Sequence, residues 1–198
     1  MSTAVNSPVS IESQWALPYK GTVGMACLIA AESAIFTIFV VAYLYYIGKS
    51  VSGPTPREVL HLPVFATVCL LSSSLTIHAA VGAIRKGNLG VFRLWWFITL
   101  ALGAIFLFET GREWDHLIYH EGLTISTNLF GTTYYSLVGL HAFHVSVGLI
   151  GLLTVLVLAL LGKVQPEHTR NVDVFAMYWH FVDVVWIVVF TVVYVIGR

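Results

Sequence analysis

The chain alternates long apolar segments with short polar ones. Five segments are long and mostly apolar, and stretches rich in Gly, Pro or charged residues separate them: residues 22–47, 62–84, 91–116, 132–161 and 172–196. A helix needs about 20 apolar residues to cross a hydrocarbon core about 30 Å thick, where no water satisfies the backbone. The pattern therefore predicts an all-α polytopic membrane protein, a bundle of five transmembrane helices in a single domain over residues 1–198, preceded by a polar arm at residues 1–18.

The composition supports the same class. Of 198 residues, 58% are hydrophobic and 10% are Asp, Glu, Lys or Arg, whereas soluble domains carry about a quarter charged residues. This excludes an ordinary water-soluble domain and a disordered tail. Ten basic and ten acidic residues leave a formal net charge of +0, which excludes the strongly basic balance that a nucleic-acid-binding protein needs. The separated Cys27 and Cys69 form no CxxC pair, and we interpret both as small buried hydrophobic residues.

Basic residues between the helices indicate the orientation. If the N-terminus is cytoplasmic, the inner segments hold six basic residues: Lys20, Arg85, Lys86, Arg93, Lys163 and Arg170. The outer segments hold four: Lys49, Arg57, Arg112 and Arg198. This weak positive-inside bias places the C-terminus outside. Anionic phospholipid headgroups could bind at four of the inner residues, Arg85, Lys86, Lys163 and Arg170, although the same bias explains these residues without a lipid site.

One acidic residue, Glu32, lies well inside the first predicted helix, where a charge is costly unless a polar group faces it. By helical rise, Glu32 is about 15 Å inward from residue 22, and His141 and His144 are about 14 and 18 Å from residue 132. His180 is about 12 Å from residue 172. Matched depth therefore predicts that Glu32 is enclosed and hydrogen-bonded to His141 or His144, with His180 the next choice.

Other polar patterns allow two metal hypotheses. His78, His141, His144, His180 and Asp183 could build a haem or metal site inside the membrane, although hydrogen-bonded packing also accounts for them. Glu113, His116, His120 and Glu121 could form a surface metal cluster, but polar residues at headgroup depth need only solvation. A transporter would more often show two paired halves around broken helices.

Small residues in the second predicted helix favour close helix contact. Ser73, Thr76 and Ala80 are therefore predicted to contact a partner subunit, with packing inside the chain as the alternative. Several Trp and Tyr residues are interpreted partly as anchors at the membrane interface: Trp95, Trp96, Trp114, Trp179, Trp186, Tyr134 and Tyr135.

Two motifs identify a resemblance beyond composition. YWHFVDVVW at residues 178–186 resembles the last-helix signature of the cytochrome c oxidase subunit III family, and GLHAFHVSVGLIGL at residues 139–152 is similar to its penultimate-helix motif. Residues 62–76, the AESAIF segment around Glu32 and residues 98–114, which include Glu113, resemble three further segments of the family. Together these cover most of the chain.

The resemblance implies a non-catalytic subunit of a bacterial proton-pumping haem-copper terminal oxidase, which passes electrons from cytochrome c, or from quinol, to oxygen. It implies no cofactor in this chain, haem and copper in partner subunits I and II, bound phospholipid, and roles in stabilising the catalytic subunit and supporting proton uptake. The location implied is the bacterial cytoplasmic membrane. A related accessory protein of nitric oxide reductase and a histidine-liganded membrane redox enzyme are the alternatives.

Two features depart from the family pattern. Mitochondrial members have two additional N-terminal helices, so this chain resembles the shorter five-helix bacterial form. Glu109 stands where Gln is more usual in the family, one helical turn before Glu113. Because like charges at this spacing repel, Glu109 is expected to be protonated or to lie beside a cation.

Overall fold

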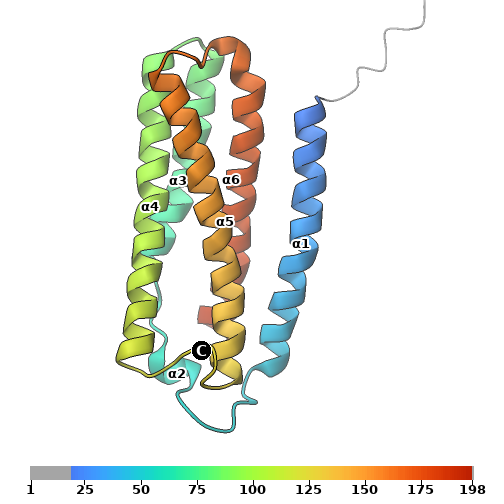
Figure 1. Cartoon of the computed structure of the whole chain (residues 1–198), viewed down its shortest axis with the longest axis vertical. Helices are drawn as coiled ribbons and strands as arrows, with labels where there is room; N and C mark the ends of the chain where they lie inside the picture. Colours follow the sequence, from blue (N-terminus) through green and yellow to red (C-terminus); the bar gives the residue numbers. More distant parts are fainter. Residues whose placement is uncertain (1–18, 198) are drawn as a thin grey trace, which may run out of the picture.

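The computed structural model describes residues 19–197, so the predicted polar arm lies outside the described residues. Within this range five segments are long and apolar enough to cross a membrane, and no strand occurs (Figure 1). They are α1 (Lys20–Tyr46), α3 (Val64–Arg85), α4 (Leu89–Tyr119), α5 (Leu129–Leu160) and α6 (Thr169–Phe190), which continues as the π-helix η3 (Thr191–Ile196). Two short helices, α2 (Pro56–Val59) and η2 (Pro166–His168), lie in the connections. The all-α prediction is confirmed, and the expected bounds differ from these by three residues or fewer.

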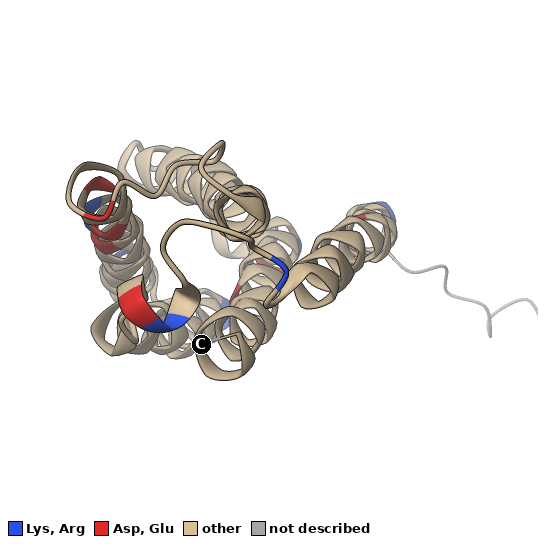
Figure 2. Ribbon diagram, turned by 90° about the horizontal axis from the view of Figure 1, so that it is seen from below, with Lys and Arg blue, Asp and Glu red and all other residues tan. Residues whose placement is uncertain are grey.

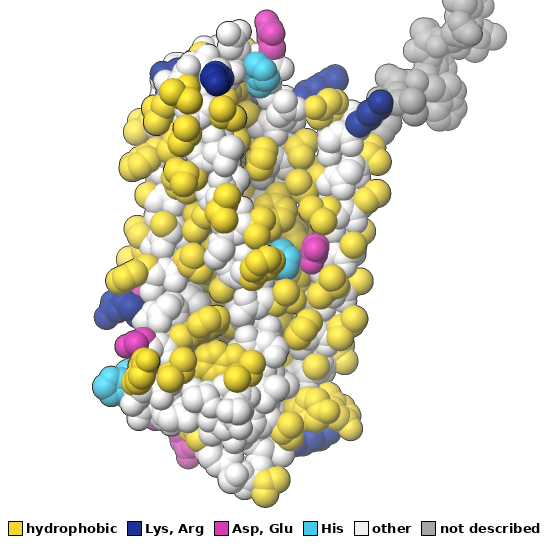
Figure 3. Space-filling view, viewed as in Figure 1, with side chains coloured by type: hydrophobic (Ala, Val, Ile, Leu, Met, Phe, Trp, Pro, Cys, Tyr) yellow, Lys and Arg dark blue, Asp and Glu magenta, His cyan; other side chains and the backbone are white. Residues whose placement is uncertain are grey.

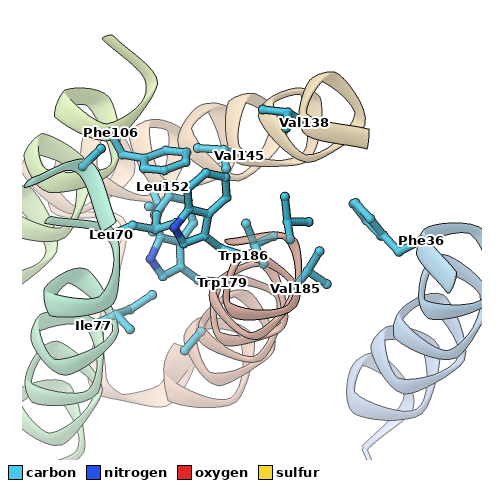
Figure 4. Packing of buried hydrophobic residues seen from close by; sticks show 14 of the residues in the cluster. Phe36, Leu70, Ile77, Phe106, Val138, Val145, Leu152, Trp179, Val185 and Trp186 are labelled. Atoms are coloured by element: carbon cyan, nitrogen blue, oxygen red, sulfur yellow. The ribbon is translucent and has the colours of Figure 1, made fainter. Parts of the chain in front are cut away.

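Four of the long helices form a closed ring, and the first lies outside it. α3 contacts α4, α4 contacts α5, α5 contacts α6, and α6 contacts α3, while α1 packs on α5 and α6 (Figure 1). The buried residues of α1 are Phe36 and Tyr43. Phe36 lies on α1 and points toward the core (Figure 4). Most of the apolar surface of α1 faces outward, and the exposed Cys27 corrects the expectation that both cysteines are buried.

Local capping explains where two of the long helices begin. The side chain of Asn88 accepts the N–H of Val91 at the start of α4, and that of Asn128 accepts the N–H of Gly131 at the start of α5. The Asn128 amide also donates to backbone carbonyls of the loop at residues 52–54, which ties this loop to α5. Gly87, with φ of +74°, permits the tight turn between α3 and α4.

The ring is filled by large aromatic side chains. Trp179 lies between Gly103 of α4 and Gly148 of α5, where an added Cβ would approach the indole to 2.7 and 2.8 Å. Figure 4 shows Trp179 and Trp186 of α6 directed into this cluster. The fully buried aromatic residues include four of the expected interface anchors: Trp96, Trp179, Trp186 and Tyr134. For these four, the interface interpretation is corrected to core packing.

Two neighbouring layers of core side chains are separated by one more residue along α6 and η3 than along α4 and α5. One layer contains Phe106, His141 and Trp186, and the next, toward the C-terminal end, contains Glu113, Tyr134 and Tyr194. The layers are seven residues apart in α4 and α5 but eight residues apart in α6. The π-helix η3 accommodates the additional residue, because its turns contain more residues than α-helical turns.

Candidate functional site in the helical bundle

A polar contact joins α1 to the ring near the middle of both helices. Oε2 of Glu32 lies 3.1 Å from Nε2 of His144 on α5, the pairing that matched depth predicts. The His144 side chain is 8% exposed, whereas that of Glu32 is 23% exposed, which corrects the expectation that Glu32 is enclosed. Figure 3 shows an acidic and a histidine side chain adjoining at mid-height, among mainly hydrophobic side chains.

The hydrogen bonds of His144 determine how this pair holds its protons. Nδ1 lies 2.8 Å from the carbonyl oxygen of Leu140, which can only accept, so Nδ1 carries a hydrogen. Nε2 then either accepts a hydrogen bond from the O–H of a neutral Glu32 or, when protonated, donates one to a Glu32 carboxylate. Both arrangements have zero net charge, with one proton shared between the two side chains. The pair therefore avoids the cost of an isolated ion in a membrane interior.

Neighbouring aromatic residues hold His144 in place. The ring of Phe36 on α1 packs against the imidazole with centroids 4.9 Å apart. The hydroxyl of Tyr178 on α6 donates to the backbone carbonyl of His144 at 3.1 Å. Three helices, α1, α5 and α6, therefore meet at this imidazole.

Three hydroxyl side chains of α3, those of Thr67, Ser73 and Ser74, face α6. Trp179 Nε1 donates to Ser73 Oγ at 2.8 Å, and His180 Nδ1 lies 2.6 Å from Ser74 Oγ. One further contact lies closer to the start of α3, where Trp186 donates to Thr67. These contacts form a row of hydrogen bonds along the interface between α3 and α6.

This row corrects the predicted subunit interface. Ser73 and Ala80 are fully buried within the chain and have no surface for a partner. Thr76 is half-buried and its hydroxyl lies 2.7 Å from that of Thr99 on α4. The small residues do permit close helix contact, but the contact is with α4 and α6.

His141 and Asp183 are among the buried polar side chains that make no hydrogen bond within residues 19–197. His141, 1% exposed, stacks on Trp186 and meets Phe106 edge-on. Asp183, 3% exposed, places its carboxylate in the interior near the α3–α6 interface. His180, by contrast, is half-buried and bonded to Ser74.

The described residues do not form a metal site with three or more side-chain ligands. In the part of the chain that the structure describes, no group of three or more His, Cys, Asp or Glu side chains is placed to hold a metal ion. At the surface, His116 and His120 stack on each other with ring centroids 5.1 Å apart. The surface metal cluster of Glu113, His116, His120 and Glu121, one of two explanations considered from the sequence, is therefore not found among the described residues.

At the C-terminal end of the bundle, Glu113 lies beside a pair of tyrosines. The Tyr194 hydroxyl donates to the Glu113 carboxylate, 3.0 Å from either oxygen, and lies 3.3 Å from the hydroxyl of Tyr134. Glu109, the unusual acid, lies 3.2 Å from Arg112. Of the two explanations offered for Glu109, a nearby cation is the one that the structure contains.

The basic residues considered for lipid lie together at the opposite end. Arg85 at the end of α3 donates to both carboxylate oxygens of Asp173 on α6, each at 3.0 Å. Lys86 and Lys163 are exposed, and the Arg170 guanidinium lies 5.7 Å from the ring centre of Tyr19. Since Arg85 already has an acidic partner, a phosphate at this end would depend mainly on the other three.

Sequence reasoning missed Ser74, Tyr178 and Tyr194 as members of the polar contacts. Tyr194 carried no periodic signal, because the π-helix moves it out of the seven-residue spacing. Ser74 stood in a run of three serines, and the sequence could not show which of them faces His180.

Comparison with known proteins shows that the chain is similar to third subunits of bacterial oxidases. Residues 19–198 match the model of the family described as cytochrome c oxidase subunit III. The chain is 34% identical to "Probable cytochrome c oxidase subunit 3" of Nocardia farcinica, over 98% of each chain. It is 39% identical to "Cytochrome c oxidase subunit 3" of Synechocystis sp., over 87% of this chain and 74% of the relative. "Quinol oxidase subunit 3" of Bacillus subtilis is 31% identical over 97% and 95%.

Proposed function

Since this chain belongs to the cytochrome c oxidase subunit III family, we propose that it is the non-catalytic third subunit of a bacterial haem-copper terminal oxidase. The observation that carries this proposal is the family match, which extends over all five membrane-spanning segments. In the proposed complex, partner subunits I and II hold the haem and copper centres and pass electrons from cytochrome c to oxygen. The names of the relatives include both cytochrome c and quinol oxidases, so quinol is the alternative donor.

The proposed role of this chain is to stabilise the catalytic subunit. The interior of the ring is occupied by aromatic and hydrogen-bonded side chains, which suits a rigid scaffold. An outward face of α3 carries exposed apolar residues one or two turns apart, including Phe65, Val68 and Leu75. Together with the outer face of α1, this surface is our proposed contact with the catalytic subunit, in place of the buried small residues.

We place the start of α1 on the cytoplasmic side of the cytoplasmic membrane. Among the described residues, six basic side chains lie at that end of the helices: Lys20, Arg85, Lys86, Arg93, Lys163 and Arg170. Three lie toward the other end: Lys49, Arg57 and Arg112. This asymmetry supports a cytoplasmic N-terminus. Anionic phospholipid at the six-residue end is part of the same proposal.

The Glu32–His144 pair is proposed to fasten α1 to the ring and, as a secondary role, to contribute to proton supply. The shared proton supports the second role, since the pair can exchange it without changing net charge. Glu32→Gln in the intact oxidase tests it, because Gln keeps a hydrogen bond but holds no exchangeable acid proton. A slower proton uptake with an unchanged subunit composition is expected, and unchanged uptake would leave only the fastening role.

Assembly is tested by affinity purification of the tagged chain from its native membrane. We expect a haem-containing catalytic subunit to co-purify in equal amount. Leu75→Trp should reduce this recovery, whereas Ile150→Trp, on the exposed face of α5, provides a matched control. Recovery of the chain alone with one haem bound to it would contradict the proposal and favour a redox enzyme.

A further inference from the structure

A pocket of about 340 Å³ lies at the end of the molecule opposite the start of α1, where four segments meet. Its walls come from the end of α1, the loop and first residues of α2, the start of α5 and Gly197 after η3. Apolar side chains such as Ile47 and Phe130 line the pocket, and among residues 19–197 no acidic side chain does. A hydrogen-bond donor in this pocket therefore has no carboxylate of the described chain to face.

Two donor side chains of this pocket have no partner among residues 19–197. Tyr43 is 1% exposed, yet its hydroxyl makes no hydrogen bond. Arg57 is exposed and makes no ion pair, because its neighbour Glu58 turns back to accept the backbone N–H of Thr55 at 2.8 Å. That hydrogen bond lowers the pKa of Glu58. An unbonded buried hydroxyl is unfavourable, so the pocket lacks an acceptor.

The charge around the pocket favours an anionic occupant. Figure 2 looks at this end and shows acidic residues gathered on the left, on α4, which carries Glu109, Glu113 and Asp115. On the side of the pocket, Arg57 is accompanied by the exposed Lys49 of the loop. The cationic side chains of the pocket thus lie apart from the acidic end of α4.

The available donors suit a carboxylate better than a phosphate. The first amides of α5 are already occupied. Ser50 accepts the N–H of Phe130, and the Asn128 side chain accepts that of Gly131. The guanidinium and the buried hydroxyl remain, and together they can serve the two oxygens of one carboxylate. A phosphate would bring further charged oxygens into a mainly apolar pocket, where an unpaired charge is costly.

The same loop carries an apolar side chain that a protein surface could cover. Val51 follows the lining residue Ser50 and is 100% exposed, on a loop beyond the end of α1. Hydrocarbon chains do not extend past the ends of membrane-spanning helices, so they would leave Val51 in water. A loop of another protein, with an acidic residue among apolar ones, would cover Val51 and fill the pocket together.

We propose that this pocket receives an acidic side chain from a loop of a partner subunit, on the C-terminal side of the membrane. One carboxylate oxygen pairs with Arg57, the other accepts from Tyr43, and apolar residues of the same loop cover Val51. This inference rests on the proposed function, because an assembled oxidase supplies the partner. Arg112, at the same end, already faces Glu109 and lines a different pocket, so it serves as a control.

The first test treats the purified oxidase complex of Arg57→Lys with a water-soluble carbodiimide. This reagent joins an amine to a carboxylate in direct contact as an amide, and takes up the water that is lost. Mass spectrometry of the digested complex should show position 57 joined to an aspartate or glutamate of another subunit. Arg112→Lys is the matched control, because Arg112 lies 3.2 Å from Glu109 and its replacement should couple within the chain. Coupling at position 112 without coupling of position 57 to another subunit would overturn the proposal.

The second test measures how fast this chain dissociates from the complex in detergent. Arg57→Gln should dissociate about tenfold faster than the wild type, the size expected for loss of a charged hydrogen bond, and Arg112→Gln should not. Tyr43→Phe keeps the ring and removes the hydroxyl, so it should also dissociate faster. Unchanged dissociation of both Arg57→Gln and Tyr43→Phe would refute a carboxylate in this pocket.

Other occupants give different results in the same complexes. If Arg57→Gln loses a bound phospholipid, or loses binding of inorganic phosphate, while this chain dissociates at the wild-type rate, the proposal is wrong and the site is one for lipid or free anion. Failure of the proposed function is distinguishable, because the tagged chain would then be recovered without any haem-containing subunit.

Discussion

The contact between Glu32 and His144 predicts a measurable energetic coupling between α1 and α5. We expect Glu32→Ala and His144→Phe to be non-additive, because each removes the same 3.1 Å hydrogen bond. Phenylalanine retains a ring against Phe36, so this variant isolates the polar term.

The magnitude follows from the position of the pair. Double-mutant cycles on hydrogen bonds between transmembrane helices give about 0.6 kcal/mol on average and about 1.7 kcal/mol for the strongest pair. This pair shares a proton and His144 is nearly buried, so we expect a coupling in the upper part of that range, about 1 to 1.7 kcal/mol. Glu32→Gln should lose less than Glu32→Ala, since an amide can still bond to Nε2.

The coupling is measured as a double-mutant cycle on the free energy of unfolding of the full chain in detergent micelles. Thr37→Val serves as the control, because the Thr37 hydroxyl donates at 2.7 Å to Ser33 within α1 and does not reach α5. A Glu32–His144 coupling no larger than the Thr37–His144 value, within about 0.3 kcal/mol, would refute the reasoning.

Two further substitutions follow from the core. Gly148→Ala places a Cβ 2.8 Å from Trp179 and should destabilise the chain by about 1 to 3 kcal/mol. Gly139→Ala is the control, because its Cβ would lie 3.5 Å from the Trp114 ring and should change the free energy of unfolding little. Tyr194→Phe removes the hydroxyl that donates to Glu113 and should lower the free energy of unfolding by about 1.5 to 3 kcal/mol. Thermal unfolding measures both substitutions. An unchanged stability of Tyr194→Phe would show that this hydrogen bond is not needed.

Hydropathy and helical rise predicted much of this structure. Spanning a hydrocarbon layer requires long apolar segments, so the five helices were visible in the sequence. Because the rise per residue is constant, the depth of residues could be compared between helices. This comparison predicted that the hydrogen-bond partner of Glu32 lies on the helix that carries His144. For Glu109, charge repulsion left a protonated acid and a nearby cation as alternatives, and the structure places Arg112 beside it.

The sequence could not show whether a given helix face packs against the rest of the chain or faces outward. Serine and threonine favour close helix contact, but the preference is the same for a partner subunit and for a neighbouring helix of the same chain. The Ser73 contact with Trp179 settles this in favour of the chain itself. Tryptophan is similarly ambiguous, because it is favoured at membrane interfaces and also fills cores.

The additional residue between Trp186 and Tyr194 bears on how the length of such a chain can vary in evolution. In an α-helix, the loss of one residue turns every following side chain by about 100°. Between Trp179 and Trp186, such a deletion would therefore disrupt the core. Within η3, a deletion would instead restore ordinary α-helical winding and leave a tyrosine facing Glu113. Related chains that differ by one residue at this point can accordingly keep the same core.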